Sequence, residues 1–231
     1  MTALPYTQRE VDEAYAVLDR SGLILIKLDI GYGFAGRSEE SIRRMYELKG
    51  RPESNPCVVP GNIAVLLELC TGIDATVLDW LRAQMEWTSL SVIGDLNNDS
   101  QLWLSLPELV RKQCSKNGSV AVFLNAGAFL LALLERSLKD GKLFAGSSAN
   151  LSGQGNVYRP EALAPSLIAG ADLFIDHGAA RYENSERMAT TMIDLRTCQV
   201  TRRGVNYTQL ADSLAKLRET LSRGAHEQQS T

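Results

Sequence analysis

The chain contains the stretch Leu23-Ile24-Leu25-Ile26-Lys27-Leu28-Asp29-Ile30, in which every second residue from Ile24 to Ile30 is apolar. This alternation predicts a β-strand with one packed face and a second face, carrying Lys27 and Asp29, that is free for chemistry. A helix is expected next, with Ser38 as its N-cap and Gly50 at its end. Because strands and helices continue to alternate, the sequence predicts an α/β fold with a mixed sheet.

The same patterns locate the remaining elements. Further strands are predicted over 56–59, 89–93, 119–124, 142–146, 172–175, 190–195 and 199–202. Further helices are predicted over 62–70, 75–85, 129–138, 161–168 and 207–221. Residues 94–118 are polar and turn-rich, which favours a surface excursion. We expect a single domain over 1–221 and a disordered tail over 222–231.

Composition limits the class of protein. The 231 residues are 45% hydrophobic and carry a net charge of −3, so RNA would have to be bound through a local basic patch. No apolar run has the length of a membrane span and the N-terminus lacks a signal-peptide pattern, so we expect a cytoplasmic protein with no membrane partner. The four cysteines lack C-x-x-C spacing, which favours buried reduced thiols over a zinc site.

Two polar segments about a hundred residues apart are the main functional signal. Lys49-Gly50-Arg51-Pro52-Glu53-Ser54-Asn55-Pro56 provides cations after a helix, and Gly146-Ser147-Ser148-Ala149-Asn150-Leu151-Ser152-Gly153 provides hydroxyls and amides after a strand. Together these groups are suited to binding phosphate. Separately, each segment is equally typical of a helix C-terminus or an ordinary turn. No Rossmann, P-loop or serine-hydrolase motif is present.

The order of these and other motifs resembles the YrdC/Sua5 family of threonylcarbamoyl-adenylate synthases. The matching pieces are Tyr32-Gly33, the two polar segments, residues 190–195, and Arg202-Arg203-Gly204. The resemblance implies a twisted mixed β-sheet flanked by helices, with a basic concave face. It also implies condensation of an amino acid, bicarbonate and ATP, with Mg²⁺ or a similar divalent ion, into a carbamoyl-adenylate that is used for tRNA modification.

The resemblance assigns roles by position. The ATP-binding residues would be Lys49, Arg51, Asn55, Ser119, Ser148, Asn150 and Arg202. Among these, Lys49 and Arg51 would be catalytic, because they stabilise the charge that develops on phosphate oxygens. The acceptor pocket would be lined by Leu28, Asp29, Tyr32, Pro60, Phe123, Ser148 and Thr190. Metal ligands stay unassigned, and Arg202 has the alternative role of a solvated surface cation.

Three single positions and one residue pair depart from the family pattern. Leu28 replaces a threonine, Pro60 a histidine and Phe123 an arginine, and Gly127-Ala128 replaces a His-Pro pair. Loss of an arginine opposite a substrate carboxylate removes about 1.5 to 3 kcal/mol of binding. We therefore expect an acceptor amine other than threonine. Two alternatives are that Phe123 only fills the core and that Lys27 supplies the lost cation.

A second class of function stays open from the sequence. The chain is alternatively a non-catalytic module that binds nucleotides or double-stranded RNA, since the family resemblance also implies an RNA-binding concave surface. Arginines such as Arg37, Arg43 and Arg44 would then join the site cations on a local basic face. The partners expected are thus ATP with a small amine or amino acid, and RNA through that basic face.

Overall fold

The computed structural model describes residues 6–228, which form two mixed sheets flanked by helices. The smaller sheet has the strand order β8-β2-β1-β9, in which only β1 and β9 pair in parallel. Its strands are β1 (Ile24–Leu28), β2 (Gly31–Gly36), β8 (Ala145–Ser148) and β9 (Leu173–Ile175). The predicted mixed α/β class is confirmed, but the strands divide into two sheets where one was expected.

The larger sheet has the order β11-β10-β5-β7-β3, with β4 added beside β5 and β6 beside β7. Its strands are β3 (Val59–Gly61), β4 (Cys70–Thr71), β5 (Leu90–Leu96), β6 (Ser115–Lys116), β7 (Ser119–Leu124), β10 (Thr191–Asp194) and β11 (Gln199–Arg202). The β3–β7 and β5–β10 pairs are parallel and the others antiparallel. A two-way backbone bridge between Val58 and Gly146, with N···O distances of 3.0 and 2.9 Å, joins the sheets.

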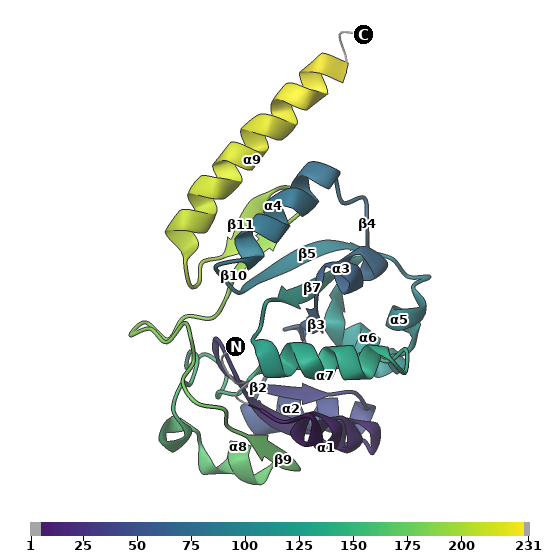
Figure 1. The fold of residues 1–231 in the computed structure, drawn as a ribbon. Coiled ribbons are helices and arrows are strands. Elements are labelled where there is room, and N and C mark those ends of the chain that lie inside the picture. Colours follow the sequence, from purple (N-terminus) through teal and green to yellow (C-terminus); the bar gives the residue numbers. More distant parts are fainter. Residues whose placement is uncertain (1–5, 229–231) are drawn as a thin grey trace.

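Helices cover both sheets. They are α1 (Gln8–Asp19), α2 (Glu39–Lys49), α3 (Ile63–Leu69), α4 (Ala75–Met85), α5 (Gln101–Leu104), α6 (Glu108–Cys114), α7 (Ala128–Leu138), α8 (Pro165–Ala169) and α9 (Tyr207–Gln228), with a 3₁₀ turn at Pro160–Ala162. Figure 1 shows α1, α2 and α8 around the smaller sheet, α4 and α9 at the opposite end, and α7 between these groups.

The first strand and helix follow the sequence pattern closely. Ser38 caps α2 through its hydroxyl and Gly50 ends it in the left-handed conformation (φ 56°), as predicted. The structure adds β2, which the alternation did not indicate because its residues, Gly31–Gly36, are half glycine. Gly31 has φ 106° and a Cβ there would lie 2.5 Å from the Val157 carbonyl oxygen, so the β1–β2 turn requires glycine.

Three further segments differ from expectation. Helix α1 was not predicted, although Thr7 and Glu10 form a capping box at its start. Residues 94–118 contain α5 and α6 instead of only surface loop, because Trp103 and Val110 bury their side chains there. Helix α9 continues to Gln228, so residues 222–228 are helical where a disordered tail was expected. The rest of that expected tail, 229–231, lies outside the described residues.

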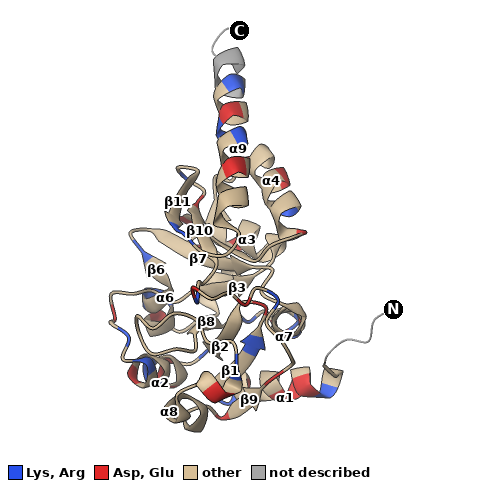
Figure 2. Ribbon diagram, turned by 90° about the vertical axis from the view of Figure 1, so that its left-hand side faces the viewer, with Lys and Arg blue, Asp and Glu red and all other residues tan. Residues whose placement is uncertain are grey.

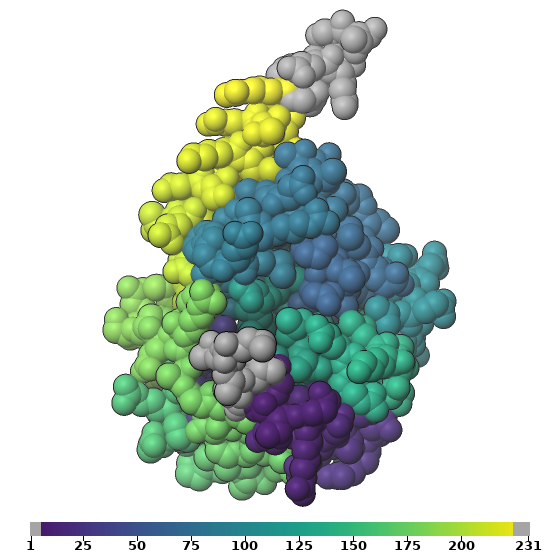
Figure 3. All heavy atoms as spheres, in the orientation of Figure 1, coloured from purple at the N-terminus to yellow at the C-terminus, as the bar shows by residue number. Residues whose placement is uncertain are grey.

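Helix α9 extends past α4 and away from the body of the molecule (Figure 1), and Figure 3 shows its described side chains, in yellow, beside α4. Its base is anchored because Leu210, Leu214 and Leu217 are buried. Basic and acidic residues are interspersed along the exposed part of α9 (Figure 2). An ion pair of 3.9 Å between Arg223 and Glu219, one helical turn apart, accompanies its continuation past 221. The basic concave face stays a prediction.

A single apolar core runs through both sheets. It includes the fully buried residues of β1, and all four cysteines are buried as free thiols, as predicted. No helix within residues 6–228 combines the length and apolar character that crossing a bilayer requires.

Candidate active site

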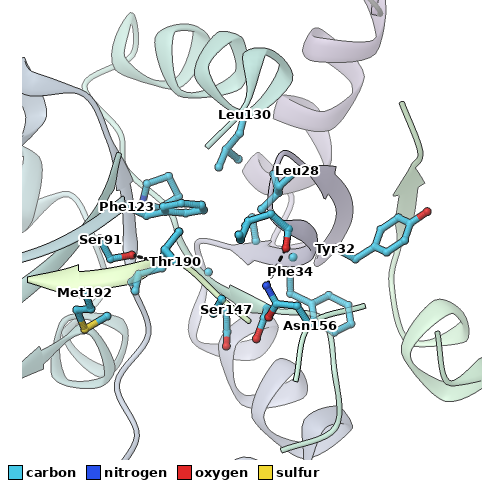
Figure 4. A pocket seen from close by; sticks show the side chains of 18 of the residues that line it. Leu28, Tyr32, Phe34, Ser91, Phe123, Leu130, Ser147, Asn156, Thr190 and Met192 are labelled. Carbon is cyan, nitrogen blue, oxygen red and sulfur yellow. Dashed lines mark hydrogen bonds between the residues drawn. The ribbon is translucent and has the colours of Figure 1, made fainter. Parts of the chain in front are cut away.

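A cavity of about 130 Å³ lies between the two sheets. It is bounded on one side by β2 and β8 of the smaller sheet and on the other by β3, β5, β7, β10 and β11 of the larger sheet. Figure 4 shows the side chains that line it. We call this cavity the inter-sheet pocket, and its two ends differ in chemistry.

Two arginines form the cationic end of the inter-sheet pocket. Arg51 donates to the carbonyl oxygens of Asn55 (3.1 Å) and Pro56 (2.7 Å). Arg202 donates to the Thr190 carbonyl oxygen (3.0 Å) and hydroxyl (2.9 Å). In the described part of the chain, no carboxylate lies within 4.0 Å of either guanidinium. These hydrogen bonds orient both cations without neutralising them, which is the arrangement of an anion site.

The two guanidinium groups also act on each other. Desolvation by the surrounding protein lowers the pKa of Arg202, and the nearby charge of Arg51 lowers it further. Arg202 nonetheless keeps part of its side chain exposed, so a ligand can reach it. Because an anion between them would relieve this repulsion, the pair is suited to phosphate.

Lys49, the last residue of α2, hydrogen-bonds to the turn that follows β8. Its ammonium is almost fully buried and donates to the carbonyl oxygens of Ser148 and Asn150 (2.9 Å for Asn150) and to the Asn150 side chain (3.3 Å). Burial, followed by repulsion from Arg51, lowers the pKa of Lys49 to about 7. Lys49 therefore positions Ser148, which lines the pocket, while its own side chain is outside the lining.

Hydroxyl and amide groups occupy the middle of the pocket. The Ser148 hydroxyl donates to the side-chain oxygen of Asn150, which the sequence placed in the site but which lies outside the pocket lining. Across the pocket, the hydroxyls of Ser91 and Thr190 are 2.8 Å apart, and Figure 4 shows this pair. Ser91 and Asn156 line the pocket but were missed from the sequence, because neither lies in one of the polar segments. The position of Ser91 in a predicted strand, at an alternating site, was the available signal.

The opposite end of the pocket is apolar. Leu28 of β1, Pro60 of β3 and Phe123 of β7 line this end, and Figure 4 shows Leu28 and Phe123 near Leu130. The sequence predicted the first three as acceptor-pocket residues, and the structure brings them together. Phe123 is buried but borders the cavity, so it packs in the core and lines the pocket at once.

Comparison with known families places the fold that carries this pocket. A family model that covers Sua5, YciO and YrdC proteins, described as "Telomere recombination", matches residues 16–204. The chain belongs to the Sua5/YciO/YrdC family. A search among curated proteins finds no sequence match.

Solved structures of the Sua5/YciO/YrdC family share the fold at low sequence identity. A P. abyssi Sua5 complexed with L-threonine has a TM-score of 0.67 and 22% identity, over 86% of this chain and 55% of that one. The hypothetical protein smu.1377c of Streptococcus mutans has a TM-score of 0.76 and 16% identity over 93% of both chains. E. coli YciO has a TM-score of 0.66 and 19% identity over 86% of this chain and 91% of that one. The present chain thus spans about half of the Sua5 chains it matches.

Several residues that the family resemblance assigned to the site lie elsewhere. Ser119 begins β7, at the opposite end from Phe123, and its hydroxyl donates to the Lys116 carbonyl oxygen (2.7 Å). Asn55 is exposed, and its backbone carbonyl, not its amide, contacts Arg51. The structure brings neither side chain into the pocket lining. A strand position places a residue on a face, whereas the distance along the strand decides whether it reaches the site.

Two other assigned residues, Tyr32 and Asp29, do not direct their side chains into the inter-sheet pocket. Tyr32 lines the pocket through its backbone, and its ring points away from the cavity (Figure 4). Asp29 borders a second cavity on the far side of Phe123.

The alternative in which Lys27 replaces the family arginine is wrong on geometry. Lys27 points to the opposite face of β1 from Leu28, donates to the Tyr158 carbonyl oxygen, and lies 4.3 Å from the centre of the Tyr32 ring. Its buried ammonium is outside the lining of the inter-sheet pocket.

Proposed function

We propose that this chain is an adenylyl transferase that condenses an amine, bicarbonate and ATP into a carbamoyl-adenylate and releases pyrophosphate. The observation that carries the proposal is the pair of uncompensated cations, Arg51 and Arg202, at one end of a pocket whose other end is apolar. Membership of the Sua5/YciO/YrdC family supports this class of reaction.

The chemistry needs positioning and charge more than a protein nucleophile. The amine and bicarbonate give a carbamate and water, and a carbamate oxygen then attacks the α-phosphorus of ATP. The bond from that phosphorus to the bridging oxygen breaks, and pyrophosphate leaves with the electron pair. Negative charge accumulates on phosphate oxygens in the transition state, so Arg51 and Arg202 would stabilise it electrostatically. Ser148 would offer a hydroxyl between the nucleotide and the acceptor.

The residues of this pocket are suited to Mg²⁺ only when the ion is bound to the phosphates of ATP. The lining of the inter-sheet pocket contains no Asp, Glu, His or Cys, and the described residues include no cluster of three such side chains. The protein therefore provides no carboxylate cage there. Mg²⁺ commonly binds through substrate phosphates and water, so MgATP would be the substrate.

The proposed acceptor is an amine other than threonine. A carboxylate at the apolar end would lie beside Leu28, Pro60 and Phe123, none of which carries a charge or a side-chain hydrogen-bond donor. Desolvating an unpaired carboxylate is strongly unfavourable. Since Lys27 points to the other face of β1, it does not compensate.

The test is incubation with ATP, Mg²⁺, ¹³C-bicarbonate and a set of amines, followed by mass spectrometry of the nucleotides and a pyrophosphate assay. We expect an amine-dependent adenylate that contains the ¹³C label, together with pyrophosphate. The double variant Arg51→Gln/Arg202→Gln should lose both products, whereas Arg82→Gln, an exposed arginine on α4, should keep them. ATP binding without pyrophosphate for any amine would overturn the proposal and favour a non-catalytic nucleotide-binding module.

A further inference from the structure

A second cavity of about 350 Å³ lies next to the inter-sheet pocket and shares Pro60, Phe123 and Leu130 with it. Figure 4 shows where Phe123 and Leu130 lie in the inter-sheet pocket. We call the second cavity the Asp29 cavity. Its remaining walls are Asp29, Gly61, Asn62, Met85, Asn125, Ala126, Gly127, Ala128, Leu131, Leu134 and Arg181. The proposed reaction leaves this cavity without a role.

The backbone of Asp29 is fixed in position, and its carboxylate has no partner among the described residues. Its backbone N–H donates to the Ala126 carbonyl oxygen (3.2 Å), and its backbone carbonyl accepts from the Tyr182 N–H (2.8 Å). Within residues 6–228, no group hydrogen-bonds to the Asp29 side chain and no cation lies within 4.0 Å of it. Burial raises the pKa of Asp29, and the charge of Arg181 opposes that shift only from a distance.

The chain leaves space beside this carboxylate. Gly127 has φ 115°, and a Cβ there would lie 3.1 Å from the Asp29 Oδ1 atom. A side chain at position 127 would therefore be strained and would crowd the carboxylate. The amide group of Asn125 is not available to Asp29, because it donates to the carbonyl oxygens of Met85 (2.7 Å) and Thr88 (3.0 Å).

The remaining walls are mainly apolar. Met85, Phe123, Leu130, Leu131 and Leu134 surround the space next to Asp29. An unpaired, half-buried carboxylate is favourable only when it gains a cation or hydrogen-bond donors. Apolar walls around it favour a ligand whose body is hydrocarbon.

We propose that the Asp29 cavity binds an alkylammonium ion, with the ammonium group at Asp29 and the aliphatic chain against Leu130, Leu131 and Leu134. Arg181 at the exposed rim weakens this binding by like-charge repulsion. The site is separate from the cations that hold the nucleotide, and it does not depend on the proposed reaction.

The experiment is calorimetric titration of the full chain with n-hexylamine in the absence of ATP, beside n-hexanol and n-hexanoate as neutral and anionic probes. We expect binding of the amine, at least tenfold weaker binding of n-hexanol, and none of n-hexanoate. Asp29→Asn should weaken amine binding at least tenfold. The matched variant Asp176→Asn, which changes a carboxylate outside the cavity, should leave it unchanged.

Arg181→Gln tests the same site without altering a buried group, and it should tighten amine binding a few-fold because a like charge is removed. Circular dichroism checks that Asp29→Asn is folded; if it is not, the Arg181→Gln result decides. Absence of amine binding, equal affinity for n-hexanol, or weaker amine binding by Arg181→Gln would each overturn the proposal.

Discussion

The two ends of the inter-sheet pocket obey different physical constraints. At the cationic end, Arg51 and Arg202 are held by backbone carbonyl oxygens and carry uncompensated charge. At the apolar end, Leu28, Pro60 and Phe123 are packed with core residues. Two cations close to each other repel unless an anion lies between them, whereas apolar residues are favourable without a ligand. The cationic end therefore gives stronger evidence of function, and under the proposed function the apolar end would select the acceptor.

The largest expected effect comes from neutralising the cationic end. Arg51→Gln/Arg202→Gln should weaken ATP binding at least about a hundredfold, because each charged hydrogen bond contributes roughly 1.5 to 3 kcal/mol. Calorimetric titration with MgATP measures this change, with Arg82→Gln as the matched control. A double variant that binds ATP like the wild type would show that the cationic end is not the nucleotide site.

The next effect comes from making the apolar end more like the family pattern. Phe123→Arg should raise threonine-dependent pyrophosphate release about tenfold to a hundredfold, since a charge-assisted pair with the carboxylate becomes available. Phe123→Leu, which stays apolar, is the control. Because Phe123 is buried, unfolding by urea must first establish that both variants are folded. No gain in a folded Phe123→Arg variant would mean that other residues set the acceptor.

A smaller effect is expected between the two ends. Ser148→Ala removes the hydroxyl that bonds the Asn150 side chain and borders the pocket. Loss of about 1 kcal/mol should reduce pyrophosphate release roughly fivefold. Ser152→Ala, in the exposed turn that follows, should have no such effect. If both variants behave alike, Ser148 has no role beyond the turn.

Lys49 provides a pH test of the cationic end. Its pKa in the folded chain, about 7, is below its ordinary value of 10.5, so between these values the unfolded chain holds more protons. Stability therefore rises with pH across this window. Relative to Lys49→Met, the wild type should gain on the order of 3 kcal/mol in free energy of unfolding from pH 7 to 10. Lys112→Met, an exposed lysine, is the reference, and a pH-independent difference between wild type and Lys49→Met would contradict the account.

The smallest effect on activity is expected at Lys27. Lys27→Met should leave pyrophosphate release within about twofold, because the side chain lies outside the pocket, but it should lower stability by roughly 1 to 3 kcal/mol as the Tyr158 carbonyl loses its donor. Measuring pyrophosphate release and urea unfolding on the same variant separates the effect on activity from the effect on stability. Loss of activity at unchanged stability would indicate that Lys27 contributes to the acceptor site.

The sequence predicted the residues of each end better than their arrangement. The motif order identified Arg51, Ser148 and Arg202, because charged and turn residues leave local signatures. It misplaced Ser119, whose position depends on how far along its strand the site lies, and it did not indicate that Tyr32 lines the pocket through its backbone only. The division into two sheets and the glycine-rich strand β2 were also missed, since both follow from long-range pairing that no local pattern encodes.

The most direct test of the contrast between the two ends is the rate of pyrophosphate release with MgATP and bicarbonate, comparing threonine with aliphatic amines that lack a carboxylate. The account predicts release above background with at least one such amine and none with threonine. Release with threonine and with none of the other amines would contradict it, because the apolar end would then bind the carboxylate that its residues disfavour.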